Sequence, residues 1–189
     1  DPGRISKRWN NHQRYANHVN NLGKLLLLAR RLAERGANFI TVSTDFVWDM
    51  HADANNLNMV DGMEAVGTTF DHAVAAFIED IEARGLQDDI LLICSGEMGR
   101  TPRINKRGGR DHWGRLCTLA FAGGGLKMGQ VVGATNSKAE YPTERPFTPQ
   151  HLLATIYHHL GIDTEMTHRD FAGRPITILD NGQPIRELL

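Results

Sequence analysis

Ile90-Leu91-Leu92-Ile93-Cys94 is the stretch of sequence that decides the predicted fold. A continuous apolar run of this length is typical of a strand that is covered on both faces, as the strands of parallel sheets are. The residues before it predict a helix that ends at Gly85, because apolar side chains recur there at helical spacing. This apolar stripe consists of Phe70, Val74, Phe77, Ile78 and Ile81.

The same order of elements occurs once more, earlier in the chain. A helix is predicted from about Asn10 to Arg35, and Gly36 follows it directly. Its apolar stripe at helical spacing consists of Leu22, Leu25, Leu26, Ala29 and Leu32. Residues 39–43, Phe-Ile-Thr-Val-Ser, then predict a strand because they are β-branched or aromatic. Two such units in series predict an α/β fold, with a mainly parallel sheet flanked by helices.

The rest of the chain continues this pattern. A third strand is predicted at 116–122 and a short edge strand at 130–134. A helix is predicted to begin at Thr148-Pro149 and to end before Gly161, and a terminal hairpin is predicted at 175–184. Since no linker or low-complexity segment interrupts the sequence, residues 1–189 are predicted to form a single α/β domain.

Composition excludes several classes of protein. The chain has 189 residues, of which 41% are hydrophobic, and a net charge of -1, which favours an ordered globular protein over a nucleic-acid or polybasic membrane binder. No apolar stretch approaches the roughly 20 residues of a membrane span. Cys94 and Cys117 both lie in apolar runs and are predicted to be buried thiols rather than a disulfide framework.

Candidate chemistry follows the predicted strands, because ligands of open parallel sheets bind beyond the carboxyl ends of the strands. Asp49 and His51 follow the first strand and are two residues apart, a spacing that puts both side chains on one side of extended backbone. A carboxylate with an imidazole suits a cation such as zinc or manganese. The alternative is a loop with a solvated aspartate and an unrelated histidine.

The second loop carries Glu97 between two glycines, where tight turns and close backbone approach are allowed. Glu97 is therefore a candidate site residue, although it could instead pair with Arg100 or Arg103 in an ordinary turn. The third loop, 103–115, contains His112.

The basic residues that follow Glu97 are a further candidate feature. Between positions 100 and 115 they are Arg100, Arg103, Lys106, Arg107, Arg110 and Arg115. Guanidinium groups match phosphate or sulfate oxygens with two parallel donors, so this segment could bind an oxyanion. A solvated basic surface is the alternative, and nucleic-acid binding is less favoured because the chain as a whole is not basic.

Several motifs match a known pattern in order and spacing. They are Trp48-Asp49-Met50-His51, Gly96-Glu97-Met98-Gly99-Arg100-Thr101-Pro102 with Ile104-Asn105, Gly109-Arg110-Asp111-His112-Trp113, Ala122-Gly123-Gly124-Gly125-Leu126-Lys127, Gly133-Ala134-Thr135, Gly173-Arg174-Pro175 and Pro184-Ile185-Arg186-Glu187-Leu188. Together they resemble an uncharacterised bacterial sulfatase-like family, domain of unknown function 1501. That family is similar to a branch of the alkaline phosphatase and sulfatase superfamily.

The resemblance implies a metal-dependent hydrolase of sulfate or phosphate esters. It assigns Asp49, His51 and His112 as metal ligands, with Glu97 as a further ligand or as a group that orients one. The cofactor would be a divalent ion: zinc, manganese, calcium or magnesium. Met98 stands where that superfamily has a second histidine, and a thioether is a poor ligand for such ions.

The resemblance also implies catalytic roles for Glu97, Arg100 and Arg110, with Arg103 a further candidate to neutralise an ester oxyanion. In the superfamily the nucleophile comes from an N-terminal half. This chain is therefore expected to be the C-terminal portion of a longer protein and to be inactive as an esterase on its own. The partners expected are that N-terminal half and a small or polymeric ester, and the location expected for the parent is the periplasm or cell surface.

Two alternatives to an enzyme stay open. The first is a catalytically silent module that binds a metal or a sulfated glycan, because Met98 indicates a degenerate site. The second is a structural domain whose histidines bind no ligand. Metal binding separates the second alternative from the other two hypotheses, and ester turnover separates the enzyme from the silent module.

Overall fold

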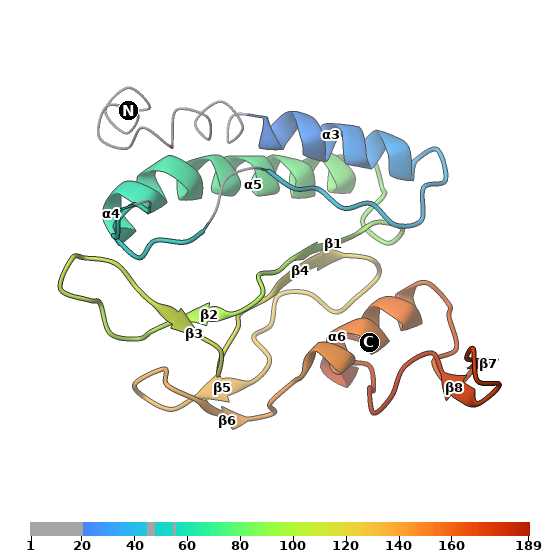
Figure 1. Cartoon of the computed structure of the whole chain (residues 1–189). Coiled ribbons are helices and arrows are strands. Elements are labelled where there is room, and N and C mark those ends of the chain that lie inside the picture. Colours follow the sequence, from blue (N-terminus) through green and yellow to red (C-terminus); the bar gives the residue numbers. More distant parts are fainter. Residues whose placement is uncertain (1–20, 45–47, 55) are drawn as a thin grey trace. The chain divides into compact units, whose positions relative to one another are not determined.

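The computed structural model describes residues 21–44, 48–54 and 56–189, and its chain divides into two compact units. The first unit ends at Gly123 and the second spans Gly124–Leu189. In the first unit the elements are α3 (Leu22–Ala33), α4 (Met59–Gly62), a π-helical turn (Met63–Gly67), α5 (Thr68–Ala83), β1 (Leu91–Cys94), β2 (Gly99–Arg100), β3 (His112–Trp113) and β4 (Ala120–Gly123) (Figure 1). The second contains β5 (Ala134–Thr135), β6 (Pro142–Glu144), α6 (Pro149–His159), β7 (Thr167–Arg169), β8 (Pro175–Thr177) and a 3-10 turn (Arg186–Leu188).

Helices α3 and α5 lie side by side and build the core of the first unit (Figure 1). The buried cluster consists of Leu26, Ala73, Phe77 and Ile81. The predicted helix over 70–81 is confirmed within α5. The helix predicted for 10–35 is confirmed at 22–33, and residues 10–20 of that prediction lie outside the described residues.

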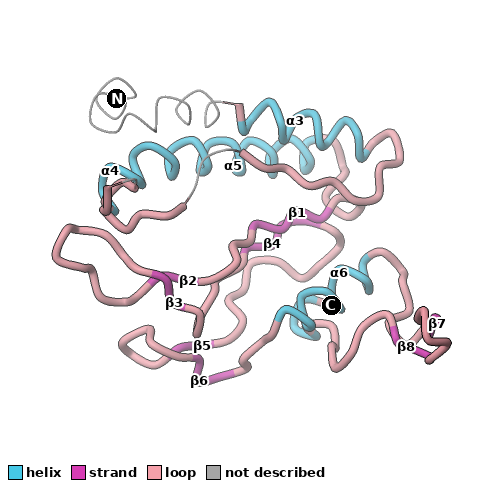
Figure 2. Tube along the Cα trace, in the orientation of Figure 1, coloured by secondary structure: helices cyan, strands magenta, loops and turns pink. Residues whose placement is uncertain are grey.

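The predicted parallel sheet is wrong. Each sheet in the described part of the chain has two antiparallel strands, paired as β1 with β4, β2 with β3, β5 with β6 and β7 with β8 (Figure 2). A parallel pair needs a crossover connection of a dozen or more residues, usually a helix, whereas the segment between β1 and β4 contains only the short ladder of β2 and β3. Residues 39–43 form no strand, and Phe39 is 70% exposed.

The misleading signal was the apolar run that contains β1. The strand itself is confirmed at Leu91–Cys94, with Leu91 opposite Gly123 and Cys94 opposite Ala120. Leu92 packs against the core of α3 and α5, so its apolar character comes from a covering helix rather than from a wide sheet. A run of apolar residues reports burial, and it does not report strand direction.

The second unit corrects further details. The helix predicted from Thr148-Pro149 is confirmed as α6. The predicted edge strand at 130–134 is reduced to β5, which pairs with β6, and the strand predicted at 116–122 is confirmed only from Ala120, as β4 of the first unit. The terminal hairpin is formed by β7 and β8 and lies earlier than the predicted 175–184.

Two observations bear on the predicted classes of protein. Cys94 is half-buried and Cys117 is exposed, so the prediction of two buried thiols is wrong for Cys117; both thiols are free in the structure. None of the helices in the described ranges combines the length and apolar character needed to cross a membrane.

Candidate metal centre

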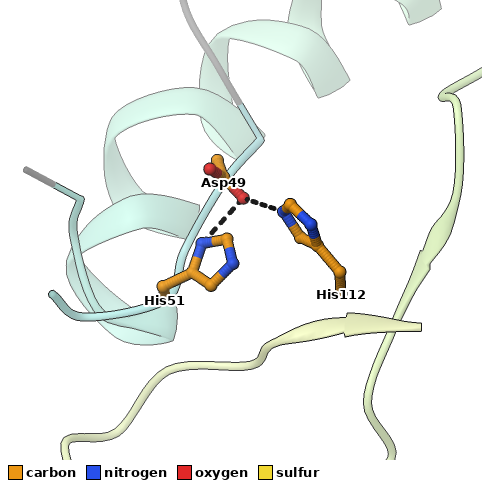
Figure 3. Close-up of side chains that lie close together, drawn as sticks. All are labelled: Asp49, His51 and His112. Atoms are coloured by element: carbon orange, nitrogen blue, oxygen red, sulfur yellow. Dashed lines mark hydrogen bonds and ion pairs between the residues drawn. The ribbon is translucent and has the colours of Figure 1, made fainter.

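Three side chains from two distant parts of the sequence meet in the first unit (Figure 3). Asp49 and His51 come from the segment before α4, and His112 comes from β3. One potential ligand atom from each residue lies within 4.8 Å of the others. The structure therefore brings together three of the four residues that the resemblance implies as metal ligands, and Glu97 is not among them.

The segment of Asp49 and His51 is anchored by the residues that alternate with them. The ring of Trp48 packs edge-on against Phe70 of α5, with centroids 5.3 Å apart. Met50 is only 4% exposed and lies against Gly62, where an added Cβ would come within 2.6 Å of its side chain. Because Met50 is buried, Asp49 and His51 lie together on the other side, as their spacing predicts.

His112 is positioned by the β2–β3 ladder. In this ladder Arg100 pairs with His112, and Gly99 pairs with Trp113. Gly99 also donates its N–H to the carbonyl of Leu116 at 2.6 Å, and an added Cβ would lie 2.2 Å from that oxygen. The ladder therefore places Arg100 and His112 opposite one another, with side chains that reach the same carboxylate.

The carboxylate of Asp49 is the electrostatic centre of the cluster. Its Oδ1 accepts a hydrogen bond from Nη1 of Arg100 at 2.6 Å and lies 3.0 Å from Nε2 of His112. The same oxygen lies 2.7 Å from Nδ1 of His51. One oxygen is thus shared by three nitrogen-containing groups, which marks it as the point where positive charge is favoured.

The buried Nδ1 of His51 is compatible with a metal bound by this donor set. Among the described residues it makes no hydrogen bond, although Oδ1 of Asp49 lies 2.7 Å away. A buried ring nitrogen that is left without a hydrogen bond beside a carboxylate oxygen is available as a ligand of a bound ion. Ligand atoms around a tetrahedral zinc lie about 3.4 Å apart, a value that falls between the shortest contacts here and the 4.8 Å limit.

The chemistry of the donors indicates the kind of ion. One carboxylate oxygen and two imidazole nitrogens suit zinc or manganese better than calcium, which prefers six or more oxygens. Three protein ligands leave a coordination position for water or substrate, as in catalytic rather than structural zinc sites. The side chain of His112 is 50% exposed, so this side of the cluster is accessible to solvent.

The other predicted site residues do not all join the cluster. The Glu97 side chain is 68% exposed, its Oε1 lies 4.0 Å from Nη2 of Arg100, and it is not one of the three clustered residues. Arg110 donates from Nη1 to the carbonyls of Thr101 and Pro102, so its guanidinium stabilises the loop. Arg103 is exposed. Of the predicted arginines, Arg100 is the one whose contact with the cluster the structure shows.

Two supporting residues were not identified from the sequence. Gly109 packs against the backbone of His51, and Asn105 donates a side-chain hydrogen bond to the same backbone. Both residues lie in motifs quoted above, but they carried no predicted role. The sequence feature that could have indicated them is the short, turn-forming segment Asn-Lys-Arg-Gly-Gly over 105–109. It predicts a tight turn but does not show what the turn contacts.

Comparison with known proteins identifies the family. The family model described as "Protein of unknown function (DUF1501)" matches residues 6–189. No curated protein and no solved structure shows a match to the chain. Since the family model covers almost the whole sequence, the chain belongs to the DUF1501 family of proteins of unknown function.

Proposed function

We propose that this chain supplies the metal-binding part of a divalent-metal-dependent hydrolase that acts on sulfate or phosphate esters. The observation that carries the proposal is the convergence of ligand atoms from Asp49, His51 and His112 within 4.8 Å. The donor set favours zinc or manganese. A metal bound there would polarise an ester oxygen and lower the pKa of the attacking group.

Arg100 supports an anionic substrate. Its guanidinium reaches Asp49 at 2.6 Å, and its side chain is 22% exposed, so it lies at the cluster and retains access to solvent. A guanidinium at this place can hold a sulfate or phosphate oxygen with two parallel donors and neutralise charge that develops on it. The proposed location of the parent protein, the periplasm or cell surface, rests on the resemblance to sulfatase-like proteins alone.

The resemblance supports the ester class in a second way. The motifs that contain Asp49, His51 and His112 are among those that resemble the sulfatase-like branch of the alkaline phosphatase and sulfatase superfamily. This likeness extends to the ligand motifs and not to the predicted parallel sheet, because the strands of the described chain pair antiparallel. Glu97 would orient solvent or substrate from the solvent-exposed side of Arg100, since its carboxylate is largely exposed and lies 4.0 Å from that guanidinium.

The test is metal content followed by turnover. The purified protein is loaded with Zn²⁺ or Mn²⁺, and bound metal is measured for the wild type, His51→Ala and His112→Ala, with His168→Ala in β7 as the exposed control. We expect one metal per chain in the wild type and control, and loss in the two site variants. Equal metal in all four proteins would refute the site.

Hydrolysis of 4-nitrophenyl sulfate or phosphate by the parent protein, abolished by Asp49→Ala, would support the enzyme.

A second candidate is a catalytically silent module that binds a metal and a sulfated glycan. The observation that favours it is the exposure of Arg103, Lys106 and Arg107, which present positive charge on the loop beside the cluster. Retained metal, no ester turnover and salt-sensitive binding to heparin by the parent protein would favour this candidate over the hydrolase.

A further inference from the structure

Asn105 connects the segments that carry the two histidines of the metal centre. Its Nδ2 donates to the backbone carbonyl of His51 at 2.9 Å and to Oδ1 of Asp111 at 3.2 Å. Asp111 directly precedes His112. One amide group therefore bonds to the backbone of the first histidine and to the neighbour of the second.

The other end of the same side chain shapes the turn. Oδ1 of Asn105 accepts the N–H groups of Arg107 and Gly109, both at 3.0 Å. The backbone N–H of Asn105 donates to the carbonyl of Gly109 at 2.8 Å, and Gly108 donates to the carbonyl of Asn105 at 3.0 Å. The donors and the acceptor of the Asn105 amide are thus both used, and the turn is closed from inside.

This turn lies directly on the backbone of the first ligand segment. Arg110 donates its N–H to the carbonyl of Met50 at 2.9 Å, next to the carbonyl of His51 that Asn105 holds. Gly109 approaches the same backbone so closely that an added Cβ would lie 2.2 Å from the carbonyl carbon of His51. Two consecutive carbonyls are therefore fixed by residues that lead, through Asp111, to His112.

We propose that Asn105 is the positioning residue of this metal centre, and that it sets the separation of His51 and His112 without touching the ion. The proposal rests on the proposed function, because it requires that the cluster binds a metal. Loss of the amide would release the carbonyl of His51 and loosen the turn before His112. The separation of the two imidazoles would then no longer be fixed by a common hydrogen-bonding group. Partners of this kind typically change metal affinity by roughly 10- to 100-fold.

Asn136 provides a matched control in the second unit. It also closes a turn, since its Oδ1 accepts the N–H of Glu140 at 2.7 Å and its Nδ2 donates to Oε2 of Glu140 at 3.0 Å. All of these contacts are confined to the loop between β5 and β6, whereas the metal cluster belongs to the first unit. Asn136→Ala therefore removes a comparable turn-closing asparagine.

The experiment measures Zn²⁺ affinity by competition with a chromogenic chelator, and the visible spectrum of the Co²⁺-loaded protein, which reports ligand geometry. We expect Asn105→Ala to bind Zn²⁺ roughly 10- to 100-fold more weakly and to change the Co²⁺ spectrum. Asn136→Ala is expected to keep the wild-type affinity and spectrum, even where both variants lower the melting temperature similarly. A role in folding alone would lower the melting temperature and leave the spectrum unchanged.

A second variant keeps the proposal falsifiable if Asn105→Ala does not fold. Asn105→Asp retains Oδ1 for the N–H groups of Arg107 and Gly109. It lacks the donor to His51 and Asp111 and places a second carboxylate beside that of Asp111, so the contacts to both histidine segments are lost while the acceptor of the turn is kept. We expect an altered Co²⁺ spectrum in this variant. Wild-type affinity and an unchanged spectrum in the folded Asn105 variants would overturn the positioning role alone, whereas a wild type that binds neither ion would overturn the metal centre and this inference together.

Discussion

The substitution Gly109→Ala tests the packing on which the metal centre depends. Gly109 is buried, and a Cβ built there would lie 2.2 Å from the carbonyl carbon of His51, 2.3 Å from its oxygen and 2.6 Å from the oxygen of Met50. Ordinary contacts of a Cβ begin at 3.4 Å, and the atoms met here belong to the backbone rather than to a flexible side chain. The turn would therefore have to move away by about 1 Å or more.

The expected cost follows from the contacts that this movement breaks. The turn and the ligand segment are joined by the hydrogen bonds from Arg110 N–H to Met50 and from Asn105 Nδ2 to His51, both 2.9 Å long. Each contributes about 1 kcal/mol, and the overpacking itself costs about 1–3 kcal/mol. We expect the free energy of unfolding to fall by about 3–5 kcal/mol, a large part of the 5–15 kcal/mol typical of a domain.

Gly114 provides the matched control in the same loop region. A Cβ added at Gly114 meets nothing within 4 Å, and its φ is not positive. Gly114→Ala is therefore expected to stay within about 1 kcal/mol of the wild type. Urea unfolding followed by circular dichroism, with Zn²⁺ affinity measured beside it, checks both variants. Equal stability and equal metal affinity of Gly109→Ala and Gly114→Ala would refute this reasoning.

Three further predictions concern other parts of the chain. Thr155→Val should lower the free energy of unfolding by about 1–3 kcal/mol, because the fully buried hydroxyl accepts a backbone N–H at 3.0 Å. Thr155→Ser keeps the hydroxyl and should lose less stability; urea unfolding measures both variants. Cys117 should react with a thiol reagent faster than Cys94 between pH 7 and 9, because burial raises the pKa of the Cys94 thiol; equal rates in single-cysteine variants would contradict this. Hydrogen bonds from the backbone and then the side chain of Arg174 hold the pKa of Asp170 below its usual range. The Asp170 contribution to the β7–β8 hairpin is therefore present at neutral pH and should be lost as the pH falls from about 4 through the folded-state pKa. Amide NMR across this range should show the loss in the wild type and not in Asp170→Asn.

The helices were the most predictable part of the fold. The stripes of α3 and α5 and the Thr148-Pro149 start of α6 are local signals, because each depends on residues within a few turns of one another. The direction of strand pairing is not a local property. Ile90–Cys94 indicated a buried strand, but only its ladder with Ala120–Gly123 shows that the pairing is antiparallel.

The candidate site was predictable for the same reason where it is local. Asp49 and His51 lie on one side of their segment because of a two-residue spacing that can be read from the sequence. Their meeting with His112, and the contact of Asn105 with His51, depend on packing between segments more than 50 residues apart. The contacts of Arg110 were not predictable either, since its guanidinium donates to the carbonyls of Thr101 and Pro102 in its own loop.

The shared oxygen of Asp49 has a consequence for how an ion would enter. Because Arg100 already donates to that oxygen at 2.6 Å, a divalent cation would exchange with a counter-ion that the protein itself provides. Binding of the ion would therefore replace an existing ion pair, and part of the attraction of the Asp49 carboxylate for the ion would be offset by the loss of that pair. The displaced guanidinium would find another carboxylate close by, since Glu97 lies 4.0 Å from its second amino group. The protein thus contains both the guanidinium that an ion would displace, Arg100, and the carboxylate that could pair with it afterwards, Glu97.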